Sequence, residues 1–135
     1  MKIRPFQFEL KDFALALYGL SLMLPAVGAA YGWEILLHGY WSIMYGGIAW
    51  FANFTFIPAY IFRKARKVLV YSLVTIALGL TSLAHNSIWN DNEGKMLVMS
   101  YNYGFYVWML SFVWLAAVSM RELRQQKMQS PSTRI

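Results

Sequence analysis

Long apolar stretches alternate with short polar segments along the chain. The apolar stretches cover about 13–33, 41–62, 68–88 and 98–120. A helix rises about 1.5 Å per residue, so about twenty residues cross a hydrocarbon layer of about 30 Å. Backbone groups in lipid must be hydrogen-bonded within the segment, and the alternation of a barrel strand is absent, so we expect helices. The pattern predicts a single all-α domain, an integral membrane bundle of four transmembrane helices, with a short polar tail at 121–135 that we expect to be disordered over 126–135.

The composition fits this class of protein. Hydrophobic residues make up 59% of the chain and charged residues only 13%, whereas soluble domains are about 45–50% apolar and about 25% charged. The chain contains no cysteine, which excludes disulfides, thiolate metal sites and cysteine nucleophiles. A secretory signal peptide is an alternative for the first stretch, because small residues follow it at 28–30. Its apolar run is longer than the usual core of about 7–15 residues, so we interpret it as a retained span.

Basic residues predict the orientation, because they collect in cytoplasmic segments. Eleven of the twelve lie before the first span, between the second and third, or after the fourth, and only Lys95 lies on the other side. We therefore expect both termini and the loop RKARK at 63–67 to be cytoplasmic, in a bacterial inner membrane. The net charge of +6 is explained by this topology and not by nucleic-acid binding. Anionic lipid is a secondary partner for the RKARK loop.

The outer end carries the sequence's candidates for chemistry. Glu34 and His38 are four residues apart and share a face if the stretch is helical, and the other histidine, His85, follows the third span. A metal or proton site is one alternative, but the second histidine of a zinc-protease motif is missing. We expect solvated groups at the membrane surface, with no metal and no cofactor. Aromatic residues favour that boundary, and the candidates are Trp33, Trp41 and Trp89.

Small and polar residues recur inside the spans at steps of three and four, which place them on one helix face. They are predicted to form the interhelical packing surface: Gly46, Ala49, Asn53, Ser72, Thr75, Gly79 and Ser82. Asn53 lies near the middle of the bilayer and needs a partner, for which the hydroxyls of the third span near Gly79 are the candidates. A polar conduit is the alternative interpretation. Ionisable groups, which coupled transporters place at this depth, are absent there.

Four short motifs occur in order: LSLMLPA at 20–26, GWEILLHG at 32–39, GGIAWFAN at 46–53 and YGFYVWMLS at 103–111. They resemble an uncharacterised family of small four-span bacterial inner-membrane proteins, over about residues 20–111. The family often continues the third motif with Pro-Leu, whereas Phe54-Thr55 follows here. The resemblance implies the topology and no activity. It also implies a shared framework of Trp33, Gly39, Trp50, Asn53 and Trp108.

These observations favour a membrane protein without catalytic activity that binds another membrane component. An accessory subunit and an immunity protein against a pore-forming toxin are two versions, and the partner is another membrane protein or a second copy. The alternative is a small-solute channel or transporter subunit that acts as an oligomer. An enzyme that uses Glu34 and His38 is a more distant alternative.

Overall fold

The structure is a computed structural model and describes residues 9–28, 30–40, 48–84, 87–90, 95–98 and 101–130. Most of these residues are helical, which confirms the all-α class. In chain order the elements are α1 (Asp12–Met23), β1 (Pro25–Val27), β2 (Ala30–Tyr31), α2 (Gly32–His38), the 3₁₀ helix η2 (Ala49–Phe51), α3 (Ala52–Ile61), α4 (Ala65–Ala84), β3 (Ser87–Asn90), β4 (Lys95–Val98) and α5 (Tyr103–Gln129).

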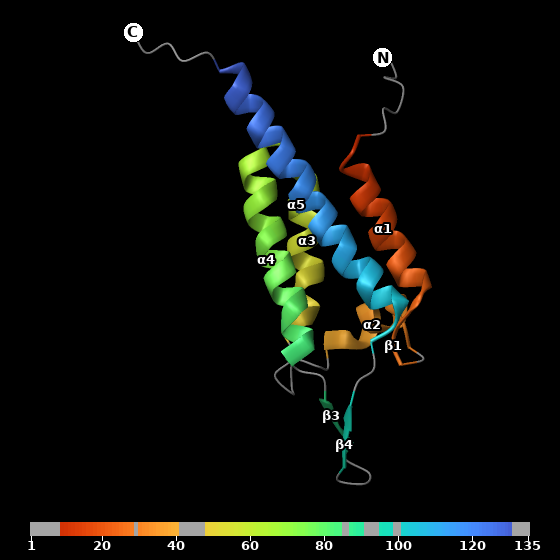
Figure 1. Ribbon diagram of the computed structural model, residues 1–135. Coiled ribbons are helices and arrows are strands. Elements are labelled where there is room, and N and C mark those ends of the chain that lie inside the picture. Colours follow the sequence, from red (N-terminus) through yellow and green to blue (C-terminus); the bar gives the residue numbers. More distant parts are fainter. Residues whose placement is uncertain are drawn as a thin grey trace.

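Four helices, α1, α3, α4 and α5, lie side by side in a bundle (Figure 1). The central helix is α5, which packs against both α1 and α4, and α3 packs against α4. The start of α1, the turn between α3 and α4, and the end of α5 lie at one end of the bundle (Figure 1). The strands and α2 lie at the opposite end. We call the first the basic end, because the helices begin or end there among lysines and arginines.

The helices differ in length from the prediction. In the described part of the chain, α4 and α5 are the two helices long and apolar enough to cross a membrane. The first helix has 12 residues and α3 has 10, which correspond to about 18 and 15 Å at about 1.5 Å per residue. The prediction of one continuous helix over 13–33 is therefore wrong. Part of the predicted second span, 41–47, lies outside the described residues.

The first helix ends because Pro25 disfavours a helical conformation at the residue before it. Leu24 is extended, with φ −103° and ψ 150°, and the chain then forms the short antiparallel pair of β1 and β2. Between these strands Gly28 has a φ of 56°, a left-handed conformation that glycine adopts without steric cost. Pro25 lies inside the predicted first span, and the helix ends before it.

Two further segments differ from the sequence interpretation. Part of the outer loop after α4 pairs as the antiparallel strands β3 and β4, which the apolar pattern did not predict. The polar segment after the fourth span is helical up to Gln129, so the disorder predicted for 126–135 is wrong over 126–129. Both errors lie at or beyond the ends of the apolar stretches.

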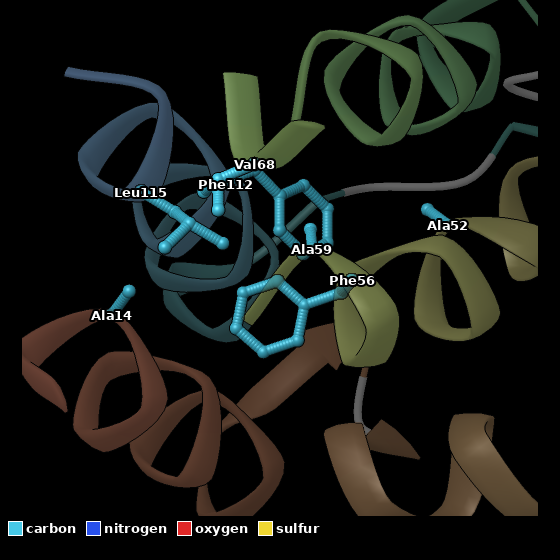
Figure 2. Packing of buried hydrophobic residues seen from close by; sticks show 7 residues of the cluster. All are labelled: Ala14, Ala52, Phe56, Ala59, Val68, Phe112 and Leu115. Atoms are coloured by element: carbon cyan, nitrogen blue, oxygen red, sulfur yellow. The ribbon is translucent and has the colours of Figure 1, made fainter. Parts of the chain in front are cut away.

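The core of the bundle combines a few large side chains with small ones. Phe56 of α3 contacts Phe112 of α5, with 5.4 Å between ring centroids, and Leu115 lies beside them (Figure 2). Ala14 of α1 and Ala59 of α3 are completely buried. Small residues allow helices to approach closely, so this core is narrow.

Candidate functional site

Asn53 is the centre of a buried hydrogen-bond cluster that joins three helices. Its side-chain oxygen accepts hydrogen bonds from the Tyr18 hydroxyl of α1 at 2.9 Å and from the Trp108 indole N–H of α5 at 3.1 Å. Its amide nitrogen donates to the Trp50 carbonyl at 3.0 Å. Asn53 is only 8% exposed, and a buried amide must be paired. The cluster therefore fixes α1 and α5 against the start of α3.

The prediction that Asn53 pairs with hydroxyls of the third span is wrong. Ser72 and Ser82 donate to carbonyls of their own helix, those of Val68 and Gly79. Thr75 bonds the Tyr71 carbonyl and also meets α3, but through Thr55 at 2.7 Å.

Tyr18 of α1 and Trp108 of α5 are the side chains that pair with Asn53. They could not be recognised as partners of Asn53, because nothing in the sequence indicates which helices are neighbours. Among the described residues, every buried side-chain nitrogen and oxygen has a hydrogen-bond partner.

The other predicted packing residues have mixed outcomes. Gly79 is buried, and a Cβ there would lie 2.5 Å from Met109 Sδ, so its close contact is with α5 and not with α3 as expected. Ala49 lies in η2, which packs against α4. Gly46 lies outside the described residues. Gly39 and Trp50 belong to the framework that the family resemblance implies, and they lie close together. A Cβ at Gly39 would lie 2.5 Å from the Trp50 side chain.

Glu34 and His38 lie on α2, as the spacing predicted. The Glu34 carboxylate accepts a hydrogen bond from the Tyr31 backbone N–H at 2.8 Å, so it stabilises the first turn of the helix. His38 is exposed and its Nδ1 lies 3.1 Å from the Glu34 carbonyl oxygen.

His85 and Trp41 lie outside the described residues. Trp89 lies on β3, and Trp33 is 47% exposed. The part of the chain that the structure describes contains no group of three residues that could hold a metal.

A cleft of about 600 Å³ opens at the basic end, between the start of α1, the turn after α3, α4 and the last part of the apolar stretch of α5. Five charged side chains line it: Glu9, Lys11, Asp12, Arg63 and Glu122. Its apolar lining is Ile61, Phe62, Val68, Leu115 and Val118, and Ser119 completes it. The sequence indicated only that the basic residues set the topology, because three distant segments form this cleft.

Hydrogen bonds at this cleft hold α1 to the end of α3. Lys11 donates from Nζ to the Tyr60 carbonyl at 3.0 Å, near the negative end of the α3 dipole. The Tyr60 hydroxyl donates to one oxygen of Asp12, and the Glu9 N–H donates to the other at 2.8 Å. These two donors, the Tyr60 hydroxyl first, lower the pKa of the Asp12 carboxyl from its usual value. Each oxygen of Asp12 therefore accepts one hydrogen bond, and these bonds favour its ionised form.

Comparison of the chain with protein-family models, with curated proteins and with solved structures gives no match in any of the three.

Proposed function

We propose that the chain is an integral protein of the bacterial inner membrane that crosses the bilayer four times, with both termini in the cytoplasm. It has no catalytic activity and acts by binding another membrane component, as an accessory subunit or as an immunity protein against a pore-forming toxin. The basic end is the cytoplasmic end under the rule that lysines and arginines collect there.

The observation that carries the proposal is the distribution of polarity across the bundle. Large apolar side chains are exposed on every helix of the bundle; examples are Leu20, Phe54, Leu73 and Leu110. Hydroxyl and amide side chains are instead buried, including Ser72, Ser111 and Asn53. Only 22% of the most apolar stretch of α4 is buried, whereas the core helix of a soluble protein is mostly buried. This arrangement suits hydrocarbon around the bundle.

The break after α1 is compatible with a bilayer, because neighbouring groups satisfy its backbone. Irregular backbone is tolerated at membrane depth where it is buried in protein. The Ala26 carbonyl accepts from the Asn102 N–H at 2.9 Å, and the Gly28 carbonyl accepts from the Asn102 side chain at 2.8 Å. The Leu24 carbonyl accepts from the Gly32 N–H at 3.0 Å. The short α1 and this hydrogen-bonded segment together supply the length of the first crossing.

The same geometry favours binding over conduction within one copy. Phe56, Phe112 and Leu115 fill the centre of the bundle, and the hydroxyl of Ser111 donates to a carbonyl of its own helix. A conduit would have to form between copies. The least buried long helix, α4, offers its exposed face, including Leu73, to a partner helix.

Single cysteines test the topology without background, because the chain has none. In intact cells, a membrane-impermeant thiol reagent should label Leu37→Cys on α2. It should label Lys64→Cys and Ser130→Cys only after permeabilisation. All three positions are exposed, so burial cannot mimic protection. Labelling at position 64 but not 37 would contradict the orientation.

A photoreactive residue at Leu73, with the buried Thr75 as the matched control, tests the partner. We expect one cross-linked protein of defined mass from position 73 and none from position 75. Adducts with lipid alone would contradict partner binding. A product of twice the chain's mass would favour the oligomeric channel.

A further inference from the structure

The cleft at the basic end gathers charges of both signs, and the positive charge of Lys11 acts on the Asp12 carboxylate. Lys11 and Arg63 supply the cationic groups, and Glu9, Asp12 and Glu122 the carboxylates. Within the described part of the chain, none of the five forms an ion pair. A volume of about 600 Å³ is in the range of small-molecule sites, about 300–1,000 Å³.

The cationic groups of the cleft have hydrogen-bond donors that no described residue uses. The Lys11 ammonium gives one of its donors to the Tyr60 carbonyl, which leaves two of the three that an ammonium carries. Arg63 is exposed and makes no hydrogen bond with a described residue. An ammonium and a guanidinium on one cleft bind a phosphate group well, through charge-assisted hydrogen bonds.

The carboxylates argue against a ligand that is only anionic. The oxygens of Asp12 are taken by Tyr60 and the Glu9 N–H. The carboxylates of Glu9 and Glu122 accept no hydrogen bond from a described residue, so both can accept from a ligand. Like charges repel a purely anionic ligand, whereas an ammonium group would be attracted.

The apolar part of the lining indicates where such a ligand comes from. Val68, Leu115 and Val118 form part of the wall and are buried. The residues that line the cleft come from the start of α1, the turn after α3 and the later part of α5, and these segments lie at the basic end (Figure 1). In the membrane placement proposed above, this is the depth of the lipid headgroups on one leaflet.

We propose that this cleft binds a zwitterionic phospholipid whose headgroup joins a phosphodiester to a primary ammonium, as in phosphatidylethanolamine. Lys11 and Arg63 hold the phosphate, Glu9 and Glu122 hold the ammonium, and the apolar wall contacts the glycerol end. This inference rests on the membrane placement but not on the protein partner.

Native mass spectrometry of the intact chain in detergent tests the site. The protein is titrated with short-chain phosphatidylethanolamine, short-chain phosphatidylglycerol and free phosphoethanolamine. We expect the ethanolamine lipid to bind about tenfold more tightly than the glycerol lipid, the size of one charge-assisted contact. Free phosphoethanolamine should compete only weakly.

Two variants separate the roles of the charges. Arg63→Gln should weaken binding of both lipids, because both carry the phosphate. Glu122→Gln should weaken binding of the ethanolamine lipid and strengthen binding of the glycerol lipid. The preference for the ethanolamine lipid is then reversed or abolished. Lys64→Gln and Arg124→Gln are matched controls on the same turn and helix, outside the cleft lining, and should leave the preference unchanged. Thermal unfolding verifies that each variant is folded.

Equal affinity for the two lipids, or a Glu122→Gln variant with an unchanged preference, would overturn the proposal. Competition by free phosphoethanolamine at the same concentration as the lipid would also overturn it, in favour of a soluble ligand. Alkaline carbonate extraction keeps the two proposals apart. A chain that stays in the membrane but lacks lipid preference refutes only this inference, whereas a chain that is extracted refutes the membrane placement.

Discussion

Replacement of Asn53 by leucine should reveal how much the buried amide contributes to the bundle. The substitution keeps a side chain of similar size and removes the shared acceptor of the Tyr18 hydroxyl and the Trp108 indole. Interhelical hydrogen bonds in membranes average about 0.6 kcal/mol and reach about 1.7 kcal/mol. Two such bonds give about 1.2 to 3.4 kcal/mol. Because both donors then lack an acceptor in an apolar interior, which carries its own cost, we expect a loss of about 2 kcal/mol.

Reversible unfolding of the full chain in mixed detergent measures this loss, and a double-mutant cycle assigns it. Tyr18→Phe removes one of the two donors. If the hydroxyl acts through Asn53, Tyr18→Phe should cost much less in the Asn53→Leu background than in the native one. Thr55→Val is the control, because the Thr75 hydroxyl keeps its bond to its own helix; it should cost at most about 0.6 kcal/mol. Additive effects of Tyr18→Phe and Asn53→Leu would refute the shared-acceptor account. A loss below about 0.5 kcal/mol for Asn53→Leu would also refute it, because surface substitutions without structural effect fall in that range.

Three further predictions use the same unfolding assay. Gly79→Leu should cost about 1–3 kcal/mol of stability by overpacking against α5. Val74→Leu should be neutral, because the Val74 side chain is 44% exposed. Equal effects of the two substitutions would mean that Gly79 does not pack as described. Glu34→Gln and His38→Gln should leave the fold intact. The purified native chain should bind no stoichiometric zinc or copper, and metal binding by the native chain that either substitution abolishes would contradict this. The lowered pKa of Asp12 means that its carboxylate stabilises the fold above its usual titration range, and that this contribution is lost as the pH falls through the folded-state pKa. Asp12→Asn should therefore reduce the acid dependence of stability, and an unchanged acid profile would contradict the role of its hydrogen bonds.

The sequence predicted the helical class well because apolar runs and basic clusters are summed over many residues. The third apolar stretch, 68–88, corresponds to α4 at Ala65–Ala84 with small errors at its ends. The break after α1 was missed because the residues around Pro25 and Gly28 are themselves apolar or small, so the apolar count continues through them. The signal was nevertheless present, since Leu-Pro and a following glycine are typical of a helix end.

The sites depended on spatial neighbours, which one sequence does not supply. Periodicity placed Asn53 on an inward face, and we expected its partners on the span that follows it in the chain. In the structure, Asn53 pairs with Tyr18 of the preceding span and with Trp108 of the distant α5, and not with the span that follows it. For the same reason the charged cleft, which combines Lys11, Arg63 and Glu122, has no signature in any one segment.

In the membrane placement proposed above, the dependence of the first crossing on Asn102 has a consequence for biosynthesis. The carbonyls of Ala26 and Gly28 obtain their donors from a residue that the ribosome adds 74 positions after Gly28. The first segment to enter the membrane is therefore the last to be completed, and its broken backbone needs shelter from lipid at the insertion machinery until α5 emerges. Chains that terminate before α5 would leave these carbonyls exposed to hydrocarbon, and quality-control proteases should remove them.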